Sequence, residues 1–227
     1  MSTENREKLA ELEEEGSSQK VARQGFIVSF MTFFSRVSGL MRDIALSYVF
    51  GASAMADVFF VAFRIPNFFR RLFAEGAFNQ AFIPVMVEFK AKGREELRIF
   101  LSSVSGLFGA LLIVFVFLGL IGSDFLVMLF APGFLSDPGK LAQTSDLVRI
   151  MFPYIGFISL TAYAGGVLNA HDRFAVPAIT PVLLNLCLII ASLLWVWKVF
   201  DGLAVVVLAW AVLLAGLAQL AFQIPSL

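Results

Sequence analysis

The chain has 227 residues, of which 59% are hydrophobic and 26 are phenylalanine, and its mean hydropathy is +0.86. A soluble domain of this length needs more polar surface to cover its core, so the composition indicates an integral membrane protein. Lysine and arginine together number 17, as do aspartate and glutamate, so the net charge gives no support for a nucleic-acid partner. The single cysteine, Cys187, excludes a disulfide within the chain.

Residues 1–20 are polar, with a short Glu/Lys-rich helical pattern that is expected to end at Gly16. They do not combine a basic start, a short apolar stretch and a small-residue cleavage site, as a cleaved signal peptide does. We therefore expect a solvated cytoplasmic extension over residues 1–20 and a transmembrane lobe over residues 21–227.

The first spanning helix is predicted over residues 21–50, and its polar side chains share one side. At about 100° per residue, an arc of roughly 160° holds Thr32, Ser35, Arg36, Ser38, Gly39, Arg42 and Asp43. This face is expected to meet water or partners, and the phenylalanine-rich face lipid or packed helices. The alternative is that Arg42 extends to the outer interface, paired with Asp43. That alternative explains Arg36 poorly, because Arg36 lies near mid-membrane.

The second spanning helix is predicted over residues 57–90 and carries the polar groups Asp57, Arg64, Asn67, Arg70, Arg71 and Glu75. A charge in hydrocarbon costs at least roughly 2.5 to 3.5 kcal/mol, so these groups are expected to face a water-filled cavity or each other. Because about 20 residues suffice to cross a bilayer, we expect this longer helix to bend at Pro66 and Gly76.

Helical phase places five of those groups on one face, namely Asp57, Arg64, Asn67, Arg71 and Glu75, and turns Arg70 away. A kink at Pro66 makes this phase unreliable beyond the break. The pattern therefore does not choose between Arg70 and Arg71.

Four further spanning helices are predicted over residues 100–121, 147–168, 177–199 and 203–223, with a loop of about 20 residues before the second of them. One set of loops is basic through Lys20, Arg23, Lys90, Lys92, Arg94, Arg98 and Arg173. The positive-inside rule places these loops in the cytoplasm. The expected fold is all-α, with six transmembrane helices and both termini cytoplasmic.

The membrane zone of the first two helices has a surplus of about two positive charges. It contains five arginines (Arg36, Arg42, Arg64, Arg70 and Arg71) and three acidic residues (Asp43, Asp57 and Glu75). Guanidinium groups bind phosphate oxygens in pairs, so the expected ligand is a phosphate or pyrophosphate. Ion pairs that only hold helices together are the alternative. His171 and Cys187 lack the neighbours of a metal or nucleophile site, so we expect a transporter without a cofactor, metal or catalytic residue.

Several segments together resemble the MurJ/MviN family of lipid II flippases. They are Ser35-Arg36-Val37-Ser38-Gly39, Arg42-Asp43, residues 57–67 (DVFFVAFRIPN), residues 70–78 (RRLFAEGAF) and residues 80–84 (QAFIP). Further matches are Ala131-Pro-Gly-Phe134, Phe152-Pro-Tyr154, Leu168-Asn169, Arg173-Phe174, Pro181 and Leu184-Asn185. The resemblance covers residues 23–227, and the motif of the second helix is long enough to be highly specific.

The resemblance implies one lobe of an exporter of the multidrug/oligosaccharidyl-lipid/polysaccharide superfamily, in the bacterial cytoplasmic (inner) membrane. Such a protein flips the undecaprenyl-pyrophosphate-linked peptidoglycan precursor, lipid II, to the outer leaflet by alternating access. The chain stops where the family's first lobe ends, so we expect half a transporter whose C-terminal lobe is missing or supplied by a partner chain. The alternatives are a flippase for another lipid-linked oligosaccharide and a truncated, non-transporting scaffold.

The resemblance also assigns roles to residues. The expected substrate-binding residues of the cavity are Arg36, Arg42, Arg64, Arg70 and Asn67, and the expected supporting residues are Ser35, Asp43, Asp57, Arg71 and Glu75. Asp57 and Glu75 are expected to hold the arginines in place. The family favours Arg70 over Arg71 as the cavity residue. The expected partners are the lipid-linked precursor and membrane lipid.

Overall fold

The computed structural model describes residues 3–72, 77–171, 173–199 and 202–227. Every regular element in these ranges is a helix, which agrees with the predicted all-α class. The α-helices are α1 (Thr3–Phe50), α2 (Ala54–Arg70), α3 (Ala77–Lys92), α4 (Arg94–Ile121), α5 (Ser123–Phe130), α6 (Pro138–Met151), α7 (Tyr154–Ala170), α8 (Ala175–Val196) and α9 (Ala204–Gln223). The 3-10 helices are η2 (Pro132–Ser136) and η3 (Ile224–Ser226).

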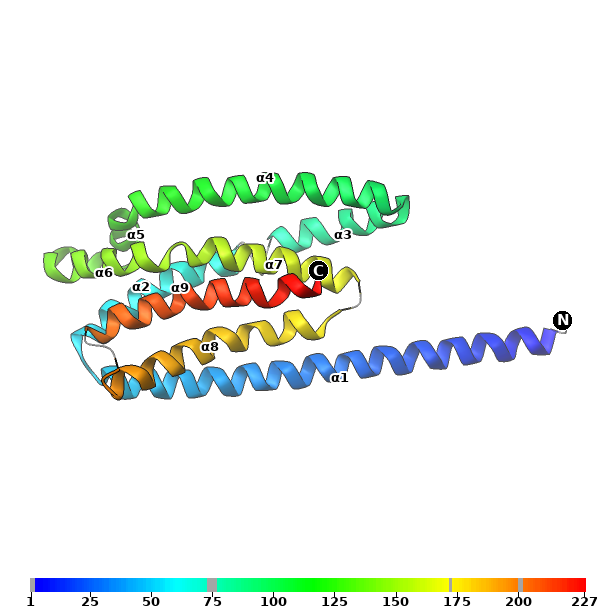
Figure 1. Cartoon of the computed structure of the whole chain (residues 1–227), viewed down its shortest axis with the longest axis horizontal. Helices are drawn as coiled ribbons and strands as arrows, with labels where there is room; N and C mark the ends of the chain where they lie inside the picture. Colours follow the sequence, from blue (N-terminus) through cyan, green and yellow to red (C-terminus); the bar gives the residue numbers. More distant parts are fainter. Residues whose placement is uncertain (1–2, 73–76, 172, 200–201) are drawn as a thin grey trace.

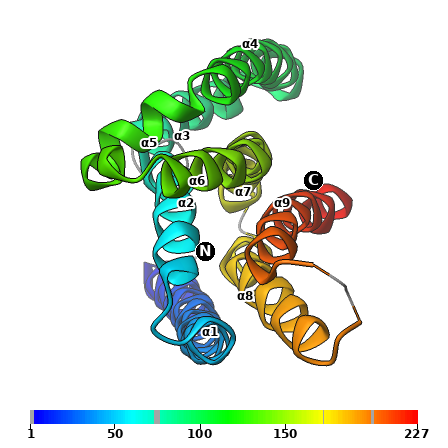
Figure 2. The same cartoon turned by 90° about the vertical axis from the view of Figure 1, so that its left-hand side faces the viewer.

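The long helices lie side by side along one direction, and the start of α1 and the end of α9 lie at the same end (Figure 1). The junctions between α3 and α4 and between α7 and α8 also lie at this end. Seen from the other end, α1, α2, α7, α8 and α9 surround a common centre, with α3 and α4 outside them (Figure 2). The main contacts of α1 are with α8, which packs in turn on α9.

Helix α1 and the predicted loop after residue 121 differ from their predicted secondary structure. Helix α1 runs through Gly16, where an end was predicted, because one glycine costs a helix only about 1 kcal/mol relative to alanine. The predicted loop after residue 121 contains α5, η2 and the start of α6. The side chain of Asp137 caps α6 by accepting from the Lys140 backbone N–H at 3.1 Å, and Pro138 suits the first turn.

The predicted second helix corresponds to α2 and α3, which lie on either side of residues 73–76 in the sequence. Pro66 lies inside α2, and Arg71 and Leu72 form a π-helical turn after it. Residues 73–76, with Gly76 and Glu75, lie outside the described residues. The predicted bend there stays a prediction.

Four helical segments in the described residues are long and apolar enough to cross a membrane: α4, the α6–α7 segment, α8, and α9 with η3. Large apolar side chains cover the outside of α4, including Leu107, Leu111, Ile113, Phe117 and Leu118, which are all more than half exposed. Lipid is the solvent that suits such a face. Helices α1 and α2 are not among the four, and α2 has 17 residues.

Gly119 of α4 packs directly against the ring of Phe152, so a substitution at this position tests the packing of the core. A Cβ atom at this position would collide with the ring of Phe152. That ring lies 5.9 Å from the Phe69 ring and 5.7 Å from the Phe115 ring, so it has little room to move. Overpacking of this kind costs about 1–3 kcal/mol. We expect Gly119→Ala to lower the thermal unfolding midpoint of the purified protein.

The matched control is Gly109→Ala on the same helix, where an added Cβ meets no atom within 4 Å. This variant is expected to unfold at the wild-type temperature or above, because alanine favours a helix. Equal midpoints for the two variants would contradict the packing of α4 on Phe152.

Candidate functional site

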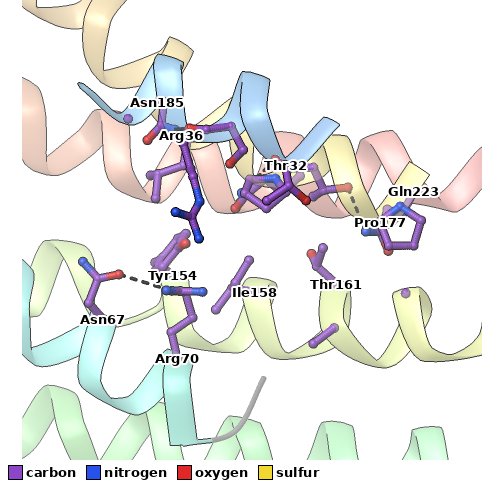
Figure 3. Close-up of a pocket in the computed structure, with 18 of the residues that line it drawn as sticks. Thr32, Arg36, Asn67, Arg70, Tyr154, Ile158, Thr161, Pro177, Asn185 and Gln223 are labelled. Atoms are coloured by element: carbon purple, nitrogen blue, oxygen red, sulfur yellow. Dashed lines mark hydrogen bonds between the residues drawn. The ribbon is translucent and has the colours of Figure 1, made fainter. Parts of the chain in front are cut away.

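A cavity of about 560 Å³ lies between α1, α2, α7, α8 and α9. Its lining includes Thr32, Ser35, Arg36, Gly39 and Arg42 from α1, Asn67 and Arg70 from α2, Tyr154, Ile158, Thr161, Gly165 and Asn169 from α7, Pro177, Thr180 and Asn185 from α8, and Gln219 and Gln223 from α9. Figure 3 shows part of this lining. Five residues of the polar arc predicted on the first helix thus line the cavity, whereas Ser38 and Asp43 do not.

One end of the cavity is lined by arginines. The side chain of Arg36 extends from α1 towards Arg70 of α2 across the open space (Figure 3). Arg70 donates its Nε–H to the amide oxygen of Asn67 at 3.2 Å. Arg42 is the third arginine here, and no aspartate or glutamate is among the cavity-lining residues that the structure describes. Clustered guanidinium groups in a hollow attract an anion and suit phosphate oxygens.

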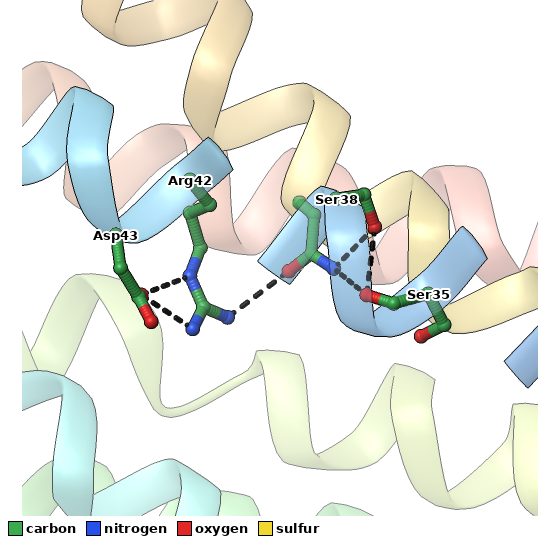
Figure 4. A network of polar contacts seen from close by, with 5 residues as sticks. Ser35, Ser38, Arg42 and Asp43 are labelled. Atoms are coloured by element: carbon green, nitrogen blue, oxygen red, sulfur yellow. Dashed lines mark hydrogen bonds and ion pairs between the residues drawn. The ribbon is translucent and has the colours of Figure 1, made fainter. Parts of the chain in front are cut away.

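Arg42 is held on two sides (Figure 4). Its Nε and Nη2 donate to one carboxylate oxygen of Asp43 at 2.9 and 2.7 Å, and its Nη1 donates to the amide oxygen of Asn185 at 3.0 Å. These bonds occupy three of the five guanidinium N–H groups and leave two for a ligand. The pairing with Asp43 that was considered as an alternative does form, and Arg42 still lines the cavity.

Asn185 links α8 to α1. It is 6% exposed, and its Nδ2 donates to the Ser38 hydroxyl at 2.9 Å and to the Ser35 carbonyl oxygen at 3.3 Å. Each polar atom of this amide therefore has a partner on α1. Such an arrangement fixes both the amide and the Arg42 guanidinium that it contacts.

The predicted site residues fall into two groups. The structure brings Ser35, Arg36, Arg42, Asn67 and Arg70 to the cavity, with Asp43 beside Arg42. Arg64 was expected among the cavity residues, but it is exposed and does not line the cavity. Arg71, expected as a supporting residue, is also exposed and outside the lining. Glu75 lies outside the described residues.

The turn of α2 explains these placements. Relative to Asn67, Arg64 and Arg71 lie about 60° and 40° to one side, and Arg70 lies about 60° to the other, at about 100° per residue. The cavity is on the Arg70 side. Helical phase alone had grouped Asn67 with Arg71, because it could not tell which flank of Asn67 faces inward.

Asp57 does not hold an arginine as expected. It lies in the first turn of α2, its side chain is 64% exposed, and its carboxylate pairs with Lys140 of α6 at 3.8 Å. Arg70 stands 13 residues later, about 20 Å along the helix at 1.5 Å per residue. Asp57 therefore pairs at the end of the bundle where α1 and α2 meet (Figure 1).

Other lining residues were not singled out from the sequence as site residues. They include Asn185 on α8 and the pair Gln219 and Gln223, four residues apart on α9. The available signal was their polarity within otherwise apolar spanning helices, where an amide is expensive. Thr161 and Thr180 gave no such signal, because a threonine hydroxyl can bond to its own helix, as both do here.

Comparisons with known proteins agree on one family. The family described as Lipid II flippase MurJ matches residues 46–227. A probable lipid II flippase MurJ of Buchnera aphidicola is 43% identical over 201 residues, 88% of this chain and 39% of its own. That of Vibrio cholerae is 43% identical over 220 residues, 92% of this chain and 41% of its own. The lipid II flippase MurJ of Burkholderia cenocepacia is 44% identical over 203 residues, covering 88% and 39%.

A solved structure, described as lipid II flippase MurJ in an inward closed conformation, matches with a TM-score of 0.76 and 32% identity. The match covers 89% of this chain and 42% of that chain. The chain thus spans about two fifths of the length of these relatives. Its apolar helices and its bacterial relatives make it a multi-pass bacterial membrane protein. The chain belongs to the lipid II flippase MurJ family.

Proposed function

We propose that this chain forms one lobe of a flippase that moves lipid II from the cytoplasmic to the outer leaflet for cell wall synthesis. The observation that carries the proposal is the cavity whose described lining holds three arginines and no acid. The diphosphate of a lipid-linked sugar is a polyanion, and this end of the cavity offers it charge-assisted hydrogen bonds. The names of the relatives point to the same cargo.

In this mechanism the arginines neutralise the diphosphate within the membrane. Arg36 and Arg70 approach it from opposite walls, and Arg42 offers the two N–H groups that Asp43 and Asn185 leave. The polar headgroup crosses in the hydrated cavity while the isoprenoid tail stays in lipid. Alternating access needs two units that move against each other around the site, so the second unit comes from the remainder of the native protein or from a partner chain.

The proposal includes six membrane crossings. The four apolar segments supply four of them, α1 supplies one, and α2 with α3 supplies one bent crossing, which Pro66 and the π-helical turn favour. Both ends of the chain lie in the cytoplasm. Support comes from Lys90, Lys92, Arg94, Arg98 and Arg173, which lie at or near the α3–α4 and α7–α8 junctions.

The test is rescue of bacteria that have been depleted of their own lipid II flippase, using the full-length native gene. Rescue is expected with the wild-type gene and with an Arg64→Ala variant, and failure with Arg36→Ala. Rescue of a strain that lacks only a flippase for another lipid-linked oligosaccharide would favour that cargo instead. Failure of the wild-type gene to rescue either strain would favour a scaffold that does not transport, and rescue that persists without the cavity arginines would contradict their role in transport.

A further inference from the structure

The end of the cavity away from the arginines is built from neutral amides and hydroxyls. Gln223 lies there with Thr161 and Pro177, beyond Ile158 as seen from Arg36 (Figure 3). Gln219 precedes Gln223 by one turn of α9, and the two residues are 1% and 2% exposed. Polar side chains this deeply buried are normally hydrogen-bonded throughout.

Thr180 of α8 fixes the orientation of both amides. Gln219 donates its Nε2–H to the Thr180 carbonyl oxygen at 3.1 Å, and a carbonyl can only accept. Gln223 donates its Nε2–H to the Thr180 hydroxyl oxygen at 2.9 Å. That hydroxyl gives its own hydrogen to the Val176 carbonyl at 2.7 Å, so it can only accept from Gln223. Turning the Gln219 amide over would set two acceptors against each other, and so would turning the Gln223 amide over while the Thr180 hydroxyl bonds to Val176.

The amide oxygens of Gln219 and Gln223 are consequently held away from Thr180, and neither has a hydrogen-bond partner among the described residues. Gly165 of α7 lies against this end of the cavity, and a Cβ atom at that position would lie 3.7 Å from the Gln223 oxygen. Two buried acceptors without donors make this state less stable than one in which a donor reaches them.

We propose that Gln219 and Gln223 form a second subsite that accepts hydrogen bonds from hydroxyl or amide N–H groups of the sugar next to the diphosphate. The inference rests on the proposed function and assigns residues to the sugar end of the same cargo. Because both oxygens are covered in this conformation, binding widens this end of the cavity.

The two ends of the cavity then bind different chemical groups of the ligand. The arginine end offers N–H donors and attracts anions, whereas the glutamine end offers acceptors and disfavours a carboxylate or a second phosphate. An asymmetric ligand with a diphosphate at one end and neutral donors at the other fits in one orientation only. Gln219 and Gln223 are therefore specificity-determining residues.

The experiment compares two soluble probes, UDP and UDP-N-acetylglucosamine, which differ by an N-acetylated sugar. Their affinities are measured by calorimetry on the full-length native protein. We expect UDP-N-acetylglucosamine to bind about tenfold more tightly than UDP, because its sugar forms two additional neutral hydrogen bonds. In Gln219→Met/Gln223→Met this preference is expected to fall below about twofold, with unchanged UDP affinity. The control is Gln143→Met on α6, where the glutamine is exposed and outside the cavity.

If the double variant does not fold, Gly165→Ala serves in its place, because it sets one methyl group beside the Gln223 oxygen and meets Pro177 only at 3.4 Å. A sugar preference that survives in the folded variants overturns the subsite. UDP binding that needs Arg36 and Arg70 but shows no sugar preference in the wild type also overturns it, and leaves the proposed function intact. UDP binding that is independent of these arginines overturns the proposed function and the subsite with it.

Discussion

Replacing Arg36 and Arg70 together with alanine is expected to weaken the binding of lipid II to the full-length native protein at least about 100-fold. Each side chain enters the cavity from its own helix, α1 or α2. A hydrogen bond to a charged group contributes about 1.5–3 kcal/mol, which corresponds to roughly 10- to 150-fold in affinity. The single variants are expected to lose about tenfold or more each, as measured by equilibrium binding of labelled lipid II in detergent.

The matched controls each remove one arginine that lies outside the cavity. Arg71→Ala changes the residue next to Arg70, and Arg64→Ala changes another exposed arginine of the same helix. Both are expected to bind lipid II within about twofold of the wild type. If Arg71→Ala weakened binding as much as Arg70→Ala, the cargo would be responding to overall positive charge, and the cavity assignment would fail.

Conservative replacement separates geometry from charge in the same assay. Lysine at position 36 or 70 keeps the positive charge but has no planar fork to hold two phosphate oxygens. We expect Arg36→Lys to recover part of the affinity that Arg36→Ala loses. Full recovery would mean that the site requires a charge without bidentate contacts.

The first helix shows what sequence periodicity can predict. Its polar arc was assigned to one face from a constant turn per residue, and Thr32, Ser35, Arg36 and Arg42 do line the cavity. The assignment succeeded because α1 is uninterrupted from Thr3 to Phe50, so phase is kept over the whole arc. The same calculation could not choose between Arg70 and Arg71, because a few tens of degrees decide on which side of Asn67 the cavity lies.

Sequence periodicity could not predict which residues form contacts between different helices. The sequence contains Asn185, Gln219 and Gln223 as isolated polar residues in apolar helices, but their partners lie on other elements, up to 150 residues away in the case of Asn185 and Ser35. For Asp57, the sequence predicted a contact that the structure does not show. It was grouped with the arginines by its place in a charged stretch, while its distance along α2 separates it from Arg70 and leaves it beside Lys140.

Replacing Asn185 with leucine is expected to lower lipid II affinity roughly 10- to 100-fold and also to lower the thermal unfolding midpoint. Leucine has the same branched heavy-atom skeleton as asparagine, so the change removes the polar contacts without shortening the side chain. Arg42 loses an acceptor at 3.0 Å, and the Ser38 hydroxyl and Ser35 carbonyl lose a donor from α8. A hydrogen bond to a charged partner carries about 1.5–3 kcal/mol, and α1 has its main contacts with α8.

Two companion variants decide how Asn185 acts. Ser192→Ala removes a buried hydroxyl of α8 that bonds only within its own helix, to the Leu188 carbonyl, and is expected to leave lipid II affinity unchanged. Asn185→Asp keeps an acceptor for Arg42 but adds a negative charge beside it, so the guanidinium is shared between two carboxylates. We expect this variant to stay folded at 37 °C yet bind lipid II at least about tenfold more weakly, because the field at the arginine end is reduced. Wild-type affinity in Asn185→Asp would show that Asn185 serves only to join α1 to α8, with no part in presenting Arg42 to the diphosphate.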